Sequence, residues 1–279
     1  MNVTNLLTLH VDMCNSNIDE LILQRVEHLA PITLPEMKSI KLMNRTDTKF
    51  VTSKAVLLRL LEMADGHYFA QHIGETCISK YRTIYWDTDD YFFYTRHHCG
   101  HAPRQKVRVR TYMDSLETFL EIKTKNNKKR TKKKRIQVPD PDSLGQEGAD
   151  FVLERTHIAL DRLHPALQNR FERITLVNYG KTERLTIDFN VEFHNFDTNR
   201  ESGTADLVII ELKRDGNVPS PILDILRRLR IEPSGFSKYC IGTVLTNSTI
   251  RQNNFKPKLQ NISRLIHKGN GVFVSKNKE

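Results

Sequence analysis

The sequence predicts an α+β fold built on an antiparallel sheet, and three observations support this. First, several segments alternate apolar and polar residues with the period of two that a β-strand requires. Second, many of these segments follow one another through short turns, which join neighbouring strands antiparallel. Third, three or four helical segments are interspersed among the strand pairs, which is typical of the α+β class.

The charges on these strands favour one particular form of that fold. On several strands one face is apolar, and the other face carries paired charges of both signs. An antiparallel sheet facing water shows this pattern, and so does a closed barrel with a wet, charged lumen and helices over its apolar face. Exposed strands usually carry Thr, Gln or single charges. Because this chain has Arg-x-Arg and Glu-x-Lys instead, we expect an antiparallel closed β-barrel, a tunnel with helices packed outside.

We expect three regions along the chain: an N-terminal lead-in over residues 1–40, the barrel domain over 41–246 and a basic C-terminal tail over 247–279. The lead-in contains a helical patch around Ile18 to Leu29. Further expected elements, in order, are a strand over Asn44 to Val51, a helix capped by Ser53, two short strands over Thr76 to Tyr94, a hairpin of Lys106 to Tyr112 and Thr118 to Lys125, a helix over Phe151 to Leu167, a hairpin of Arg173 to Tyr179 and residues 183–193, a strand over Asp206 to Lys213 and a helix over Pro221 to Arg230.

Composition narrows the class of protein. The chain has 279 residues, which is enough for one large or two small domains. Its 43 Lys and Arg exceed its 33 Asp and Glu, and the net charge of +10 favours an anionic partner. Apolar runs fall short of the ~20 residues of a membrane span, and the N-terminus lacks a secretory pattern. With four scattered cysteines, which we interpret as reduced thiols, the chain is expected to be cytoplasmic.

The hairpin between Arg104 and Arg135 carries the clearest functional signal. On its first strand Lys106, Arg108 and Arg110 share a face, and on its second strand Glu121 and Lys123 do. Like charges two apart on one strand face destabilise a sheet unless an anion compensates them. The ladder therefore indicates a polyanion site, although the solvated outer face of a sheet is an equal alternative at this point.

Motifs in a fixed order extend this signal over most of the chain. They are Arg45-Thr-Asp47-Thr-Lys49, Tyr85-Trp-Asp87, Arg108-Val-Arg110, Glu121-Ile-Lys123, the basic segment Arg130 to Arg135, Tyr179-Gly-Lys181, Arg184-Leu-Thr-Ile-Asp188, Glu211-Leu-Lys213 and Phe236-Ser237-Lys238-Tyr239. At these residues the chain resembles the bacterial polyphosphate polymerase domain of the vacuolar transporter chaperone (VTC) family. That family belongs to the triphosphate tunnel metalloenzyme (CYTH-like) superfamily. The resemblance runs from about Asn44 to about Thr243.

The resemblance implies a metal-dependent, ATP-binding transferase that moves the terminal phosphoryl group of ATP onto a growing polyphosphate chain and releases ADP. Its partners are then ATP, polyphosphate and inorganic phosphate, with no specific nucleic acid. A separate membrane partner stays open, although the chain has no membrane span of its own. Hydrolases of the superfamily begin Glu-x-Glu-x-Lys on the first strand. Arg45 stands at the first of these positions here and favours the polymerase.

The site residues follow from the resemblance. The implied catalytic residues are Lys49, Arg108, Arg110, Lys123, Arg184 and Glu211. Further phosphate ligands are Arg45, Lys106, Arg130, Lys133, Lys181, Lys213 and Lys238. The cofactor is Mn²⁺ or Mg²⁺, held by Glu211 with Asp188, Glu121 and Asp47 as further ligands, because hard cations prefer carboxylate and phosphate oxygens.

Competing interpretations accompany these assignments. A triphosphatase of the same fold, or a non-catalytic polyanion or RNA-binding module, would carry the same charges. Either Glu-x-Lys pair could be a solvated strand face, and Asp188 could pair with Arg184 structurally. The run Lys128 to Arg135 resembles a nucleic-acid patch, but such runs are usually mobile loops, and we expect Arg130 and Lys133 at a tunnel mouth. The cluster His97-His98-Cys99-x-His101 suggests zinc, yet ligands packed into one loop rarely all reach one ion.

Overall fold

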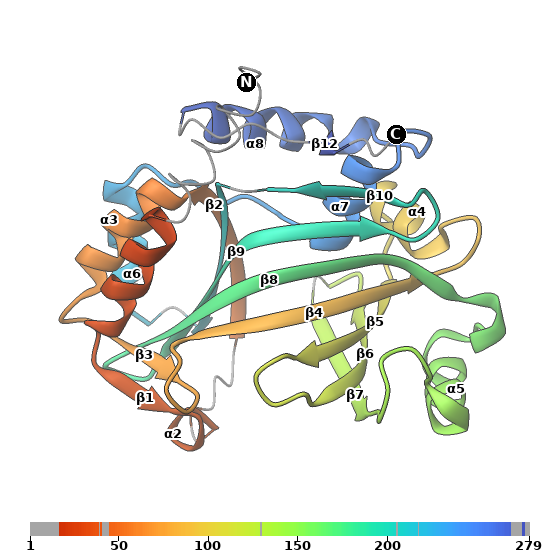
Figure 1. The fold of residues 1–279 in the computed structure, drawn as a ribbon, viewed down its shortest axis with the longest axis horizontal. Coiled ribbons are helices and arrows are strands. Elements are labelled where there is room, and N and C mark those ends of the chain that lie inside the picture. The colour runs from red at the N-terminus through yellow and green to blue at the C-terminus, as the bar shows by residue number, and fades with distance from the viewer. Residues whose placement is uncertain are drawn as a thin grey trace, which may run out of the picture.

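The computed structural model describes residues 17–38, 40, 45–128, 130–204, 206–216, 218–268 and 275–276. A curled antiparallel sheet runs through it, with helices on its sides (Figure 1). Its strands are β1 (Pro31–Thr33), β2 (Arg45–Ser53), β3 (Tyr68–His72), β4 (Ile78–Asp87), β5 (Arg104–Tyr112), β6 (Thr118–Lys125), β7 (Thr131–Gln137), β8 (His164–Asn178), β9 (Glu183–Asn195), β10 (Arg200–Gly203), β11 (Leu207–Asp215) and β12 (Ser275–Lys276).

The helices lie around this sheet. They are a helix over residues 17–27, α2 (Leu34–Lys38), α3 (Lys54–Ala64), α4 (Phe92–His98), α5 (Gly145–Thr156), α6 (Pro221–Arg228), α7 (Lys238–Thr246) and α8 (Lys256–Lys268), with 3₁₀ turns at Leu160–Arg162 and Asn253–Phe255. The α+β class and the antiparallel sheet are confirmed. Ser53 caps α3 as expected, since its hydroxyl accepts a hydrogen bond from the backbone N–H of Val56 at 3.4 Å.

The sheet is open, so the expected closed barrel is wrong. One path of hydrogen-bonded neighbours follows the order β2-β11-β9-β8-β4-β5-β6-β7, and β2 and β7, the ends of this path, do not pair with each other within the described residues. β10 and β12 branch from β9, and β3 and β1 branch from β8. The segment leading into α7, rather than a strand pair, bridges β2 and β5. Lys49 of β2 donates to the carbonyl of Phe236 at 3.1 Å, and Lys106 of β5 donates to the hydroxyl of Ser237 at 2.7 Å. Side-chain contacts with this segment therefore link the two halves.

The two faces of the sheet carry different side chains. On one face Phe50, Ile187 and Ile210 belong to an apolar cluster shared with α3, α6 and the helix over 17–27. On the same side of β5 and β6, Val109 and Leu120 belong to a cluster with α5. The opposite face, here called the inner face, carries Arg108, Arg110 and Glu121. Alternation with a period of two separates these sets, as the sequence pattern predicts.

Four expected elements have different forms in the structure. Of the two short strands expected within Thr76 to Tyr94, the first lies in β4 and the second is the start of helix α4. The Asp87 carboxylate accepts from the backbone N–H groups of Phe93 and Tyr94 at 2.8 and 2.9 Å and caps that helix. The helix expected to reach Leu167 ends at Thr156, where His157 takes a left-handed conformation with φ 60°. The rest of that segment contains the 3₁₀ turn Leu160–Arg162 and the start of β8 at His164.

Part of the lysine run expected to be a loop is strand β7. Its residues pair with β6 in a regular antiparallel register that places Lys133 opposite Lys123. Beyond residue 247, where a polar tail was expected, α8 packs Leu259, Ile262 and Leu265 against the cluster that also contains Tyr239 of α7.

Candidate functional site

Three carboxylates organise the charges of the inner face, and Glu121 on β6 is the most enclosed of them. Its side chain is 0% exposed. Arg108, directly opposite on β5, donates its Nε to Oε2 at 2.8 Å and pairs with the same oxygen through Nη2. Lys133 of β7 donates to Oε1 at 2.9 Å. Burial alone would raise the pKa of Glu121, but Arg108, Arg110 and Lys133 outweigh it and hold that pKa well below its ordinary value.

Asp188 on β9 forms the second centre. Arg173 of β8 approaches it with two N–H groups, Nε at 2.5 Å from Oδ1 and Nη2 at 2.8 Å from Oδ2. Lys238, at the start of α7, pairs with Oδ2 as well. Burial opposes ionisation of Asp188, but these two cations prevail and lower its pKa far below the usual range. Both oxygens of this carboxylate are therefore engaged by cations.

Glu211 on β11 is the third centre and is more loosely held. Its side chain is 25% exposed, and its partners are Lys213 at 3.2 Å and Lys49 at 3.9 Å. Its pKa is lowered, because the charges of Lys213, Lys49 and Lys123 outweigh the effect of burial. Lys123 lies on β6, far from β11 in the strand order. The sheet therefore curls enough to bring these two walls within electrostatic reach of one another.

Cations outnumber carboxylates on this face. Repulsion by Arg108, followed by burial, pushes the pKa of Lys123 well below its ordinary value. Lys123 makes no ion pair with any other residue that the structure describes. Burial and then Arg108 lower the pKa of Arg110 to about 10, and burial lowers that of Lys106. Such an uncompensated cluster is favourable when an anion occupies it.

Several residues expected in the site are exposed or bind elsewhere, although Arg184 and Asp47 are both register partners of Lys213. The guanidinium of Arg184 donates to the carbonyl of Met37 at 3.1 Å, and Asp188 pairs with Arg173 rather than Arg184. Lys181 is exposed in the turn between β8 and β9, with φ 55°. Arg130 is exposed in the turn before β7. Asp47 of β2 is exposed and lies opposite Lys213 in the register; the side chain of Arg45 is outside the described part.

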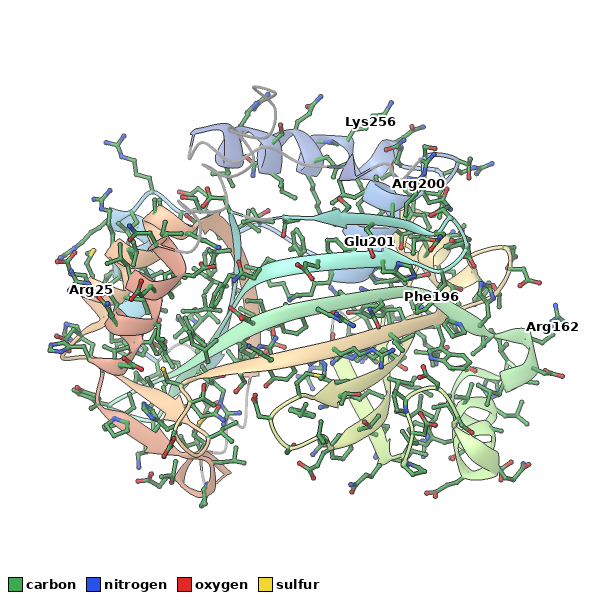
Figure 2. All side chains as sticks on the ribbon, viewed as in Figure 1. Arg25, Arg162, Phe196, Arg200, Glu201 and Lys256 are labelled. Carbon is green, nitrogen blue, oxygen red and sulfur yellow. The ribbon has the colours of Figure 1, made fainter. Side chains whose placement is uncertain are left out.

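Arg173 is the site residue that the motif comparison missed. It stands two residues after Phe171 on β8, whereas the Tyr-x-Arg pattern was assigned to Tyr179 and Lys181 in the following turn. Alternation on β8 was the available signal for the face that Arg173 occupies, whereas its position opposite Asp188 comes from the register of β8 with β9. Other cationic side chains, such as Arg25, Arg162 and Lys256, point away from the sheet at the periphery (Figure 2).

A four-carboxylate metal site is not assembled. Among the described residues, no three His, Cys, Asp or Glu side chains converge as metal ligands. The oxygens of Glu121 and Asp188 are engaged by Arg and Lys, while Glu211 faces two lysines at longer distance. This arrangement fits Mg²⁺ or Mn²⁺ held by one carboxylate together with phosphate oxygens, the usual mode for Mg²⁺ at phosphate sites.

The histidines of the cluster after β4 contact different residues. His97 Nδ1 lies 3.0 Å from the Cys240 thiol, and burial lowers the pKa of His97 to about 2. His98 accepts from the backbone N–H of Asn254 at 3.3 Å. The zinc alternative therefore has no convergent ligand set in the described residues.

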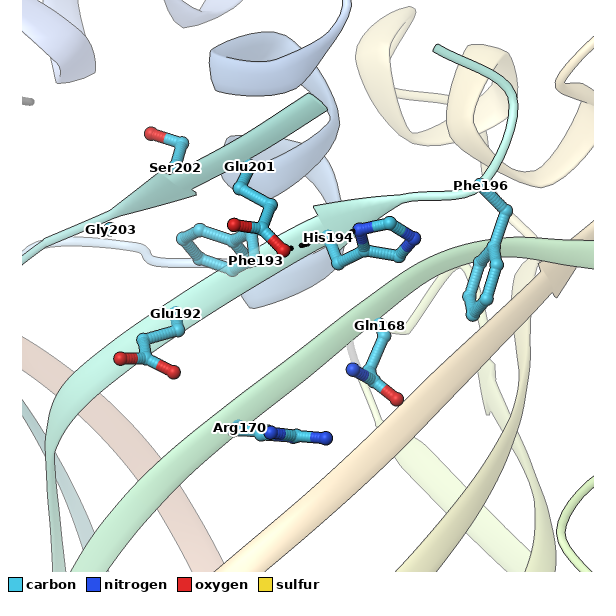
Figure 3. Close-up of a pocket in the computed structure, with 9 residues that line it drawn as sticks. All are labelled: Gln168, Arg170, Glu192, Phe193, His194, Phe196, Glu201, Ser202 and Gly203. Atoms are coloured by element: carbon cyan, nitrogen blue, oxygen red, sulfur yellow. Dashed lines mark ion pairs between the residues drawn. The ribbon is translucent and has the colours of Figure 1, made fainter. Parts of the chain in front are cut away.

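A hollow of about 540 Å³ lies elsewhere, on the face of β8, β9 and β10 turned away from α7 (Figure 3). Arg170, Glu192 and Glu201 line it, and Glu201 pairs with His194 at 3.7 Å. Its lining has one arginine against two glutamates, so the hollow lacks the cation excess of the inner face.

Fold and site together define a curled antiparallel sheet whose inner face carries more cations than carboxylates. The VTC domain family matches residues 44–247, and the chain belongs to that family. This confirms the resemblance inferred from the ordered motifs. None of the helices in the described residues is long and apolar enough to cross a membrane.

Solved structures with similarity to this chain come from several organisms. A candidate adenylate cyclase from Bacillus halodurans is 15% identical over 70% of this chain and 96% of its own, with a TM-score of 0.46. HpAC1 from Hippeastrum, described as having a dominant triphosphatase activity, is 14% identical over 72% and 96%, with a TM-score of 0.46. The S. pombe RNA triphosphatase Pct1 is 9% identical over 70% and 77%, with a TM-score of 0.29. No curated protein matches the chain.

Proposed function

We propose that this protein is a metal-dependent polyphosphate polymerase that uses ATP as its phosphoryl donor. The observation that carries the proposal is the excess of cations on the inner face, above all the half-buried Lys123 ammonium, which lacks an ion pair among the described residues and has a strongly lowered pKa. A triphosphate supplies the missing negative charge at this point. Membership of the VTC domain family supports the same substrate class.

The proposed reaction is in-line transfer between phosphates. A terminal oxygen of the acceptor chain forms a bond to the γ-phosphorus of ATP, and the bond from that phosphorus to the β,γ-bridging oxygen breaks. ADP leaves with the electron pair. Because the acceptor oxygen is already ionised near neutral pH, the transfer needs positioned cations more than a protein base.

Residues around Glu121, Asp188 and Glu211 have different roles in the proposed phosphoryl transfer. Arg108, held by Glu121, and Arg110 present guanidinium groups suited to bidentate phosphate contact. Lys123 and Lys213 add point charges. A divalent cation bound through Glu211 and phosphate oxygens would supply Lewis-acid neutralisation of the developing charge. Arg173, rather than Lys181, is the cation that we assign to the phosphate site on β8, since it lies beside Asp188 and Lys238.

Incubation of the purified protein with ATP and Mn²⁺ tests the proposal. We expect long phosphate chains and a matching amount of ADP, and we expect Lys123→Met to abolish both. Lys132→Met is the matched control, since Lys132 is exposed on the strand that carries Lys133 and alternates to its other face.

Other outcomes would point to the alternatives. Free phosphate without chains identifies a triphosphatase. Absence of turnover in wild type, with binding retained in Glu211→Ala, identifies a non-catalytic module. A nucleic-acid binder would prefer long RNA over inorganic tripolyphosphate in competition.

A further inference from the structure

The inner face changes its chemistry along β5 and β6. At one end Arg104 pairs in register with Lys125, followed by Lys106 opposite Lys123. At the other end of β5, the residue after Arg110 on the same face is Tyr112. One end of this face is therefore cationic and the other is aromatic.

The aromatic end is a continuous row across four strands. Phe171, Tyr81 and Tyr112 are successive register partners on β8, β4 and β5. Tyr81 stacks on Phe171 with centroids 5.1 Å apart and planes 3° apart, and Tyr112 lies 5.1 Å from Tyr81. Phe119 of β6 completes the row, edge-on to Tyr112 at 5.8 Å.

Two members of this row are structural and two are accessible. Tyr81 and Phe171 are 9% and 3% exposed, and Arg110 and Arg173 both lie over their rings. Tyr112 and Phe119 are half-buried. The Arg135 guanidinium lies over the Phe119 ring, 4.2 Å from its centroid.

The turn beside this end, residues 113–117, is exposed and carries both apolar and acidic side chains. Met113 and Leu116, in the turn between β5 and β6, are 42% and 71% exposed. A strand rises ~3.3 Å per residue, which places Tyr112 ~7 Å beyond Arg110 and ~13 Å beyond Arg108. An extended triphosphate with its ribose covers a span of this order, so a nucleotide held by the arginines would bring its base to the aromatic end.

We infer that Tyr112 and Phe119 form a stacking platform for the base of a nucleoside triphosphate whose phosphates occupy the cationic centre. The inference rests on the proposed function, because it takes a nucleotide as the phosphoryl donor. It also fixes the polarity of the site: the nucleoside lies at the Tyr112 end, and the phosphate chain extends toward Arg104 and Lys125. Every base has a π-face, and stacking is therefore tolerant of base identity. ATP and GTP should bind with similar affinity.

Binding measurements with two ligands test the platform without requiring turnover. Calorimetry compares a non-hydrolysable ATP analogue with inorganic tripolyphosphate in wild type, Tyr112→Leu and Phe119→Leu. Leucine keeps apolar volume and removes the aromatic face. We expect each variant to bind the ATP analogue about tenfold more weakly, as for loss of a base–aromatic stack, with unchanged affinity for tripolyphosphate. Tyr179→Leu, an exposed tyrosine on the β8–β9 turn, is the matched control and should change neither.

The outcomes separate the two proposals. Equal weakening of both ligands, or no change in either, overturns the platform. Thermal melts of each variant show whether equal weakening comes from a damaged fold, and Tyr112→Phe, which keeps the ring, must then restore wild-type affinity for the ATP analogue. A wild type that binds both ligands but makes no polyphosphate overturns the proposed polymerase alone, and the ratio of affinities still decides the platform.

Discussion

The same tripeptide pattern, Glu-x-Lys, occurs on two strands of the inner face and has two different environments. Glu121 of β6 is fully buried and bound by Arg108 and Lys133, with both oxygens engaged. Glu211 of β11 is 25% exposed and faces two lysines, the nearer at 3.2 Å. The difference is consistent with the proposed roles, in which Glu121 orients the cations around it and the more loosely held Glu211 is the metal ligand. The Glu-x-Lys motif thus predicts a charged position on a strand, whereas the surrounding residues determine how the carboxylate is bound.

The largest expected effects are those of replacing each of these two carboxylates by an amide, because the two variants should lose different properties. Glu211→Gln should reduce chain synthesis at least ~100-fold, because it removes the proposed metal ligand, and should change the free energy of unfolding little, since its ion pairs are partly exposed. Glu121→Gln should destabilise the fold by about 3–5 kcal/mol, because the buried charge of Arg108 loses its counterion.

Urea denaturation and a polyphosphate assay on both variants check this prediction. Equal losses of stability in the two variants would remove the distinction between the centres. Full activity in Glu211→Gln would reject its role at the metal.

A second experiment extends the comparison to Asp188, which also has both oxygens engaged. Arg173→Lys keeps the charge but loses the paired N–H contacts with Asp188. We expect about tenfold weaker tripolyphosphate binding, since bidentate geometry is lost. Lys181→Met is its control and should leave affinity unchanged. The reverse result, with Lys181 essential and Arg173→Lys neutral, would restore the assignment suggested by the motif order.

The smallest expected effect concerns pH. Burial, together with repulsion from Arg173, lowers the pKa of Lys238 to about 8 even though Asp188 opposes the shift. As pH rises through 8, Lys238 loses its proton and the inner face loses one positive charge. Affinity for tripolyphosphate should therefore fall between pH 7.5 and 9, by up to about tenfold.

Lys238→Arg is the control for this titration, because an arginine keeps its charge over that range. Isothermal calorimetry at several pH values should show a flatter dependence for the variant than for wild type. Identical pH profiles would exclude Lys238 as the titrating group, and the ionisation of the ligand cancels in the comparison.

Sequence patterns alone predicted much of the fold. Alternation placed Arg108, Arg110 and Glu121 on one face, because a strand sends successive side chains to opposite sides whatever its neighbours are. Ser53 was recognisable as a helix cap for an equally local reason. Helix α4 was missed because its start depends on a capping carboxylate, Asp87, within a segment that alternates like a strand.

Tertiary structure decided the rest. Arg173 and Asp188, 15 residues apart, meet because β8 and β9 pair in one register with a bulge, and local sequence does not fix that register. The link between β2 and β5 likewise comes from the distant segment at Phe236 and Ser237, which accepts hydrogen bonds from Lys49 and Lys106. The sequence by itself determined which side chains share a face. Only the packing of distant strands and α7 decided which carboxylates have both oxygens bound by cations, because ion pairs form between groups that are close in space.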